Sequence, residues 1–286
     1  MPEKCPYMEP VNIITDLHCH STASDGTLPP AEVVARAAGN EVDILALTDH
    51  DTTAGLDEAY LCAEESNIRL IPGIELSATW QGKLLHIVGL DIDPEHPPLK
   101  QGVQVLKEMR EERAIEMGRR LAKAGYHDTY ENARRLAGDG NVTRTHFARH
   151  LIEAGVAKDF TDVFKRFLVR GKPGYYRVDW STMEDAVTWI TGAGGIAVVA
   201  HPLRYKLTAN WLNRVLTAFK QAGGEGIEVI CGRNTPDDNV RSALFARKHG
   251  LLASTGSDFH EPGKWVELGR LEKLPEGLEA VWQRWV

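Results

Sequence analysis

The sequence predicts an α/β fold built on a parallel sheet that is covered by helices on its outside. Seven short apolar runs recur along the chain of 286 residues, and segments with helix start signals separate most of them. Side chains of the types that bind metals follow the ends of several runs. Seven strands favour a closed barrel, and an open doubly wound sheet is the alternative.

The predicted strands are short and rich in Ile, Leu, Val and Ala. Continuous apolar runs of this kind are typical of strands that are buried on both faces. They span residues 12–17, 43–48, 69–74, 84–90, 196–200, 226–230 and 251–255.

Helix signals lie between these runs. Residues 27–39 carry prolines at an expected first turn and a glycine at their end. Residues 181–195 place Ser181 three residues before Glu184, the spacing of a capping box. Residues 235–250 begin with Thr, Pro and two acids and end with Lys, His and Gly, which suits a helix dipole.

One region breaks the alternation of strands and helices. Residues 99–177 contain no convincing strand, and their apolar residues recur at helical spacing. We therefore expect a barrel domain of residues 1–98 and 178–286, interrupted by a helical insertion, or lid, of residues 99–177. Its expected helices lie within residues 99–125, 142–155 and 159–171.

Composition and charge restrict the functional class. The chain is 43% hydrophobic and 26% charged, as in ordinary globular domains. No apolar run reaches the ~18 to 20 residues of a membrane span, and the first twelve residues have no apolar core like that of a signal peptide. The net charge of -7 argues against a surface that coats nucleic acid, although a local basic pocket is compatible with it.

The four cysteines point to a reducing compartment. Cys5, Cys19, Cys62 and Cys231 are scattered without CxxC spacing, which indicates free thiols and not a disulfide framework. We therefore expect a cytoplasmic protein that does not associate with a membrane.

The stretch ITDLHCHSTASDG, residues 14–26, raises the question of a metal site. His18 and His20 are two residues apart, so in a strand both would point the same way and could face one ion. The alternative is a strand that ends in ordinary polar residues. This stretch alone leaves both interpretations open.

The other strand ends favour the metal. Five predicted strands are followed by imidazoles or carboxylates, and the carboxyl ends of barrel strands share one face. Burying so many titratable groups together without an ion would be costly. The sequence therefore predicts a metal site on this rim, drawn from His18, His20, Asp25, Asp49, His50, Asp51, Glu75, His201, Asp258 and His260.

The motifs DLHCHS, TDHDT, GIELS, AHP and GSDFH, in this order, resemble the PHP (polymerase and histidinol phosphatase) superfamily over nearly the whole chain. The resemblance implies a distorted (β/α)7 barrel with up to three metal ions at the carboxyl ends of its strands. It also implies nine ligands: His18, His20, Asp25, His50, Glu75, His86, His201, Asp258 and His260.

Some of these positions carry a second interpretation. Asp25 stands where many histidinol phosphatases of the family have a histidine, and the SDG form resembles another branch. His86 lies inside a predicted strand, so a hydrogen-bonded core histidine is its alternative role. Asp49 and Asp51 flank His50, and we expect them to orient ligands or face the substrate.

Nitrogen and oxygen ligands without cysteine suit Mn²⁺, Fe²⁺ or Zn²⁺, and we expect two or three Mn²⁺ ions. Two such ions about 3.5 to 4 Å apart can activate water and hold phosphoryl oxygens. The resemblance thus implies hydrolysis of a phosphate ester without a protein nucleophile. The sequence assigns no side chain as the general acid.

Substrate candidates come from the insertion and the loops. Each of these cations except Arg204, which the chain places beside His201, could instead belong to a solvated face. Tyr175 and Tyr176 could stack on a base or equally pack the lid. A cationic lid argues against histidinol phosphate, whose ammonium would favour carboxylates. The candidates are Arg144, His146, Lys172, Tyr175, Arg177 and Arg204.

The stretches TASDG, TRTHFAR and GKPGY resemble the branch that removes the 3′-phosphate from nucleoside 3′,5′-bisphosphates. The expected products are a nucleoside 5′-phosphate and inorganic phosphate. The alternative is a 5′→3′ exoribonuclease on short 5′-phosphorylated RNA. A histidinol phosphatase and a noncatalytic metal-binding module are further alternatives, and the complete ligand set argues against the module.

Overall fold

A computed structural model describes residues 13–263 and 266–286 of the chain. Residue 12, the predicted start of the first strand, and Cys5 lie outside the described residues, while Cys19, Cys62 and Cys231 are free thiols. The seven predicted strands are confirmed and form one sheet in chain order. They are β1 (Thr15–Cys19), β2 (Ile44–Leu47), β3 (Arg69–Trp80), β4 (Lys83–Leu90), β5 (Ile196–Val199), β6 (Gly226–Cys231) and β7 (Leu252–Gly256).

The sheet curls until β7 returns to β1, so it is a nearly closed barrel and not an open sheet. The backbone N–H of Asp258 donates to the carbonyl of His18 at 2.7 Å, and that of His20 donates to the carbonyl of Phe259 at 2.9 Å. These bonds lie at the carboxyl ends of β1 and β7. They bring the HxH motif, His18 and His20, beside the DxH motif, Asp258 and His260.

The prediction of an all-parallel sheet is wrong for β4, which runs antiparallel to both β3 and β5. β3 does not end at residue 74 as predicted but continues to Trp80 and turns back through Gln81 and Gly82. Both turn residues have positive φ, 45° and 73°, as a two-residue hairpin of matching twist requires. Glu75 therefore lies inside a strand and not after one.

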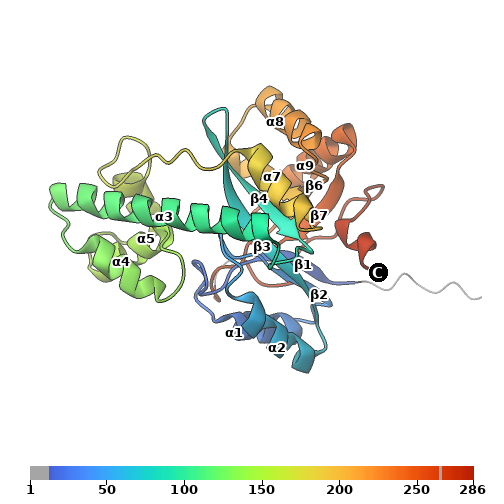
Figure 1. Cartoon of the computed structure of the whole chain (residues 1–286), viewed down its shortest axis with the longest axis horizontal. Coiled ribbons are helices and arrows are strands. Elements are labelled where there is room, and N and C mark those ends of the chain that lie inside the picture. Colours follow the sequence, from blue (N-terminus) through green and yellow to red (C-terminus); the bar gives the residue numbers. More distant parts are fainter. Residues whose placement is uncertain (1–12, 264–265) are drawn as a thin grey trace, which may run out of the picture.

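Helices cover the outside of the barrel (Figure 1): α1 and α2 lie together on one side, and α7, α8 and α9 on another. The capping box of α7 is formed by Thr182 and Asp185, one residue later than predicted. The helices are α1 (Pro30–Gly39), α2 (Leu56–Ser66), α3 (Pro97–Lys123), α4 (Thr129–Ala137), α5 (Arg144–Glu153), α6 (Phe160–Val163), α7 (Met183–Gly192), α8 (Ala209–Gln221) and α9 (Pro236–His249). Within the described residues no helix is both long and apolar enough to cross a membrane.

The segment between β4 and α7 projects from one side of the barrel (Figure 1). Helix α3 has 27 residues and, at 1.5 Å per residue, is about 40 Å long. Its first half packs Leu99 and Leu106 on the barrel core, and its second half packs Met117 and Leu121 on a separate apolar cluster shared with α4 and α5. The helix predicted at residues 99–125 is confirmed, whereas α4 was not predicted.

The barrel interior is filled by small and branched apolar side chains, and this layer supports the polar site above it. The interior cluster consists of Leu17, Ile44, Ala46, Ile71, Val88, Leu90, Val198, Ala200, Leu252 and Val281.

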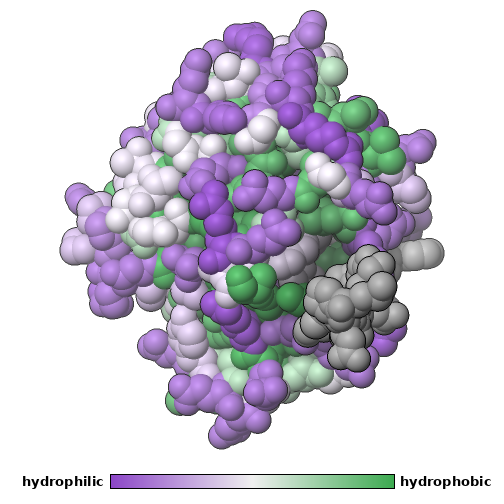
Figure 2. Space-filling view, turned by 90° about the vertical axis from the view of Figure 1, so that its right-hand side faces the viewer, coloured by the Kyte–Doolittle hydropathy of each residue, from purple (hydrophilic) through white to green (hydrophobic). Residues whose placement is uncertain are grey.

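Seen from the side away from the insertion, the surface is mainly hydrophilic with hydrophobic residues scattered over it (Figure 2).

Candidate metal centre and substrate cavity

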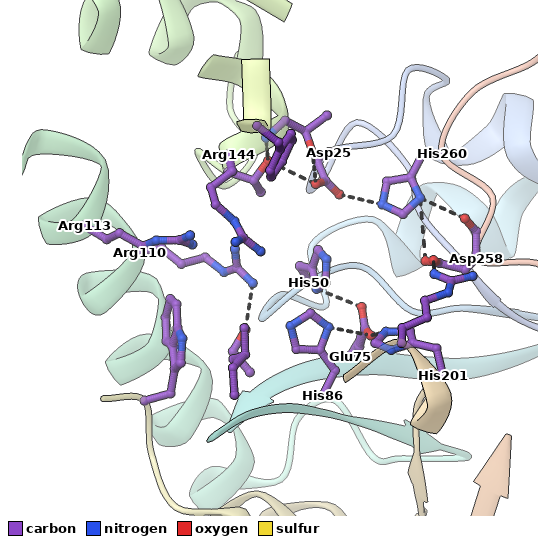
Figure 3. A pocket seen from close by; sticks show the side chains of 17 residues that line it. Asp25, His50, Glu75, His86, Arg110, Arg113, Arg144, His201, Asp258 and His260 are labelled. Carbon is purple, nitrogen blue, oxygen red and sulfur yellow. Dashed lines mark hydrogen bonds and ion pairs between the residues drawn. The ribbon is translucent and has the colours of Figure 1, made fainter. Parts of the chain in front are cut away.

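The structure brings all nine ligand candidates to one place at the barrel rim. His18 and His20 are fully buried beside Glu75, and the other candidates line a cavity of about 240 Å³ (Figure 3). His86 reaches the site from the middle of β4, because this antiparallel strand passes the rim in the opposite direction. The candidates that line the cavity are Asp25, His50, Glu75, His86, His201, Asp258 and His260.

The buried carboxylate of Glu75 is the centre of this group. Burial opposes its ionisation, but the imidazoles of His50 and His18 outweigh burial and hold its pKa well below the usual range. Glu75 is therefore an anion within a ring of imidazoles. Its oxygens lie 2.8 to 3.4 Å from nitrogens of His18, His20, His50, His86 and His201.

Several nitrogen and oxygen atoms of the site lie close together without forming hydrogen bonds, an arrangement that suits a bound cation. Nδ1 of His50 and Oε2 of Glu75 lie 2.8 Å apart, yet neither makes a hydrogen bond within the described chain. Oδ1 of Asp25 and Nδ1 of His201 are likewise buried without a partner there. Such orphaned acceptors are costly unless an ion binds them, so the site fits divalent transition metals with nitrogen and oxygen ligands.

Three overlapping sets of side chains could each hold an ion. In every set the candidate ligand atoms lie within 4.8 Å of one another. The sets are His20, Asp25, His50 and His260; His18, His20 and Glu75; and His50, Glu75 and His86.

Asp25 is held in place by the insertion. The hydroxyls of Thr143 and Thr145 donate to its Oδ2 at 3.0 and 2.9 Å, and Arg149 donates to its backbone carbonyl. Oδ1 is left facing the imidazoles and lies 3.3 Å from Nε2 of His260. The start of α5 thus orients a carboxylate that belongs to the barrel loop.

Asp49 and Asp51 hold the loops that carry ligand candidates. Asp49 accepts hydrogen bonds from the hydroxyls of Ser21 and Ser24 and so fixes the turn before Asp25. Asp51 accepts from the backbone N–H of Ser77 and from Nε of Arg110, which ties α3 to the barrel beside the site.

Three of the nine described non-glycine residues with positive φ lie at the same rim. Asp51, His201 and Asp258 have φ values of 52°, 30° and 54°, in the left-handed region that non-glycine residues rarely occupy. Each such residue costs on the order of 1 to 3 kcal/mol, and such strain gathers at functional sites.

Three arginines of the insertion face the imidazoles across the cavity (Figure 3): Arg110 and Arg113 from α3, and Arg144 from the start of α5. Arg113 and Arg144 form no ion pair with a carboxylate of the described residues. Loss of solvation and the neighbouring guanidiniums lower the pKa of both. An arginine pair without a carboxylate is suited to bind an anion.

Arg110 and Arg113 were missed in the sequence, although their spacing of three residues in a helical segment places them on one face. Arg110 and Arg113 also lie over the ring of Trp180, at 5.3 and 5.8 Å from its centroid. Glu228 was missed as well; the signal was a single acid inside the apolar strand GIEVI.

Only some of the predicted substrate residues line the cavity. Arg144 and Arg204 line the cavity, and Arg204 forms an ion pair with Asp258. His146 is buried outside it, where its Nδ1 accepts a hydrogen bond from the N–H of Thr143 and caps α5. Lys172 is exposed on a loop. It lines neither the cavity nor the pocket and groove that adjoin the cavity.

Two further hollows adjoin the cavity. A pocket of about 230 Å³ shares Arg113 and Arg144 with it and contains Tyr175 and Arg177. Tyr176 lines this pocket as well and also packs against the core of the insertion. A wider groove of about 1060 Å³ shares Arg144, Asp258 and His260 with the cavity. The cavity also shares Phe164 and Arg204 with this groove, whereas Arg149, Phe160 and Arg233 line the groove alone.

Comparisons with known proteins agree with this geometry. The chain is 46% identical over 270 residues to a 5′-3′ exoribonuclease of Haemophilus influenzae, covering 94% of this chain and 98% of the relative. It is equally 46% identical over 270 residues to a 3′,5′-nucleoside bisphosphate phosphatase of Chromobacterium violaceum, covering 94% and 95%.

A solved structure, that of an amidohydrolase from Chromobacterium violaceum with bound sulfate and no metal, superposes with a TM-score of 0.91. It shares 46% sequence identity, and the match covers 95% of each chain. The PHP domain pattern matches residues 16–235, from β1 to the start of α9. The chain therefore belongs to the PHP domain family.

Proposed function

We propose that this chain is a metal-dependent phosphomonoesterase that removes the 3′-phosphate from nucleoside 3′,5′-bisphosphates. The products are a nucleoside 5′-phosphate and inorganic phosphate. The observation that carries the proposal is one cavity with two different ends: a cluster of candidate metal ligands, and an arginine pair that has no carboxylate partner within the described residues. A substrate with two phosphates matches both ends.

In this proposal the nine candidates hold two or three Mn²⁺ ions, with Fe²⁺ or Zn²⁺ as possible substitutes. Such ions polarise a phosphoryl oxygen and lower the pKa of bound water toward neutrality. The protein fixes the ligands through Thr143 and Thr145 on Asp25 and through Asp49 on the preceding turn. No catalytic side chain beyond the ligands is assigned.

The second phosphate binds at Arg113 and Arg144 in this proposal. Asp51 neutralises Arg110 and holds it in place, whereas the other two guanidiniums remain available to an anion. Trp180 forms an apolar wall beside them. Residues 99–177 then act as a lid domain that carries the phosphate-binding arginines and also orients Asp25.

Replacing Arg144 by alanine tests the second phosphate site. A charge-assisted contact to phosphate contributes about 1.5 to 3 kcal/mol, so kcat/KM for adenosine 3′,5′-bisphosphate is expected to fall roughly 10- to 100-fold. Hydrolysis of p-nitrophenyl phosphate, which has one phosphate, should change little. Steady-state kinetics on both substrates measure the difference.

The matched control is Lys172→Ala, which removes a cation of the same insertion that lies outside the cavity. It should leave both substrates unaffected. Equal losses on the two substrates in Arg144→Ala would indicate damage to the metal centre. An unchanged kcat/KM for the bisphosphate would contradict the assignment of Arg144.

The second candidate function is 5′→3′ exoribonuclease activity on short RNA, and the groove beside the cavity favours it. Arginines and two phenylalanines line the groove, a combination that binds the backbone and bases of single-stranded nucleic acid. The same end of the cavity could hold a 5′-phosphate while the chain leaves through the groove. The name of the Haemophilus influenzae relative agrees with this activity.

Arg233→Ala distinguishes the two substrates, because Arg233 lines the groove but not the cavity. An exposed ion pair contributes up to about 1 kcal/mol, so kcat/KM for a 5′-phosphorylated RNA tetranucleotide should fall roughly two- to fivefold. The bisphosphate should be hydrolysed at the unaltered rate. A wild-type enzyme that leaves the tetranucleotide intact would rule out the second function.

A further inference from the structure

Glu228 on β6 is not one of the nine ligand candidates, yet it contacts two of them. Only 1% of its surface is exposed. Its Oε1 lies 2.5 Å from Nδ1 of His18, and its Oε2 accepts a hydrogen bond from the backbone N–H of His201, also at 2.5 Å. One carboxylate therefore joins the candidates of two separate strand ends.

A glycine of β7 makes the contact with His18 possible. β7 lies between β6 and β1 in the barrel, so the side chain of Glu228 must pass it to reach His18. A Cβ on Gly256 would lie 2.2 Å from Cβ of His18 and 3.0 Å from Oε1 of Glu228. Any larger residue would push the two side chains apart.

We infer that Glu228 is a positioning residue that holds the ring of His18 in the tautomer able to bind a metal ion. The inference rests on the proposed function, in which His18 is a ligand. The backbone N–H of His201 can only donate, so it occupies Oε2, and Oε1 accepts the Nδ1 proton of His18. The lone pair on Nε2 then faces Oε2 of Glu75 at 3.3 Å, within a set that could hold an ion.

Glu228→Gln is the informative change because an amide has one acceptor where the carboxylate has two. If the amide oxygen accepts from His201, the NH₂ group faces Nδ1 of His18, and the ring proton must move to Nε2. That tautomer has no lone pair for an ion at Nε2. If the amide is turned round, its NH₂ group opposes the N–H of His201, and two buried donors face each other.

The first measurement is the affinity of the full chain for Mn²⁺. Bound metals are removed beforehand, and calorimetric titration then gives the Kd of each ion. Loss of a carboxylate that orients a histidine ligand typically weakens metal binding about 10- to 100-fold, and we expect that loss for at least one ion in Glu228→Gln. Glu267→Gln is the matched control. Glu267 is a carboxylate that pairs with Arg36 outside the cavity, so its loss should leave Mn²⁺ affinity unaltered.

The second measurement needs no variant and so remains decisive if Glu228→Gln fails to fold. Nitrogen NMR of histidine-labelled wild-type protein, loaded with diamagnetic Zn²⁺, should show a slowly exchanging proton on Nδ1 of His18 and the metal on Nε2. Metal on Nδ1 would overturn the inference, as would a folded Glu228→Gln protein with wild-type Mn²⁺ affinity. A wild-type protein that binds no metal would instead overturn the proposed function.

Discussion

Glu75→Gln is expected to lower kcat for the bisphosphate by about 10³ or more. Glu75 lies within reach of five imidazoles, more than any other carboxylate of the described residues, and it belongs to two of the three candidate ion sets. Glutamine keeps the shape but loses the charge and therefore weakens metal binding, and a bound ion contributes several kcal/mol of charge stabilisation in the transition state. Each 1.36 kcal/mol corresponds to about a tenfold change in rate.

The fold should survive this change, because the apolar layer inside the barrel does not involve Glu75. Circular dichroism and thermal unfolding check that point, and elemental analysis should show fewer bound ions. Glu267→Gln serves as the control, since it removes a carboxylate that pairs with Arg36 on α1, outside the cavity. A Glu75→Gln enzyme with near-normal kcat would mean that Glu75 is not a ligand.

Removal of metal is expected to abolish hydrolysis, and added Mn²⁺ should restore it. Without cations, a phosphate dianion entering the cavity meets the carboxylates of Glu75, Asp25 and Asp258, whose pKa values all lie well below their usual range. Their repulsion opposes binding of the phosphate at this end. Phosphate release before and after chelation, with elemental analysis of the purified protein, measures the effect.

We expect at least two transition-metal ions in each purified chain. Each ion that binds only the folded chain should also raise the free energy of unfolding by about 2.7 kcal/mol when its free concentration is a hundred times its Kd, because binding removes folded chain from the unfolding equilibrium. Undiminished turnover by thoroughly metal-free protein would refute the metal-dependent mechanism.

Local sequence patterns were sufficient to predict the number and order of strands and the rim that carries the ligand candidates. Apolar runs and capping signals depend on neighbouring residues, and the spacing of His18 and His20 already places both side chains on one side. Their Nε2 atoms lie 3.1 Å apart in the structure. The direction of β4 was not predicted, because the Gln81–Gly82 turn is a weak signal and Glu75 resembled a strand end.

The substrate end of the site depended on contacts between residues far apart in the chain. His146 and Arg144 are two residues apart in the same helix, yet one caps the helix in a buried position and the other faces the cavity. Arg110 came to the site because Asp51, 59 residues away, accepts its Nε. No local pattern ranks such cations, because their orientation is set by how α3 and α5 pack on the barrel.

The sequence by itself indicated a seven-stranded α/β fold and placed most of the candidate ligands at strand ends. These properties follow from short-range periodicity and from residue type. Only the tertiary structure decided which atoms meet: that Glu75 lies among five imidazoles, that Thr143 and Thr145 hold Asp25, and that Glu228 reaches His18 past Gly256. The physical reason is that closing the barrel brings β1 beside β7, and packing α3 and α5 across the rim fixes directions that no single segment specifies.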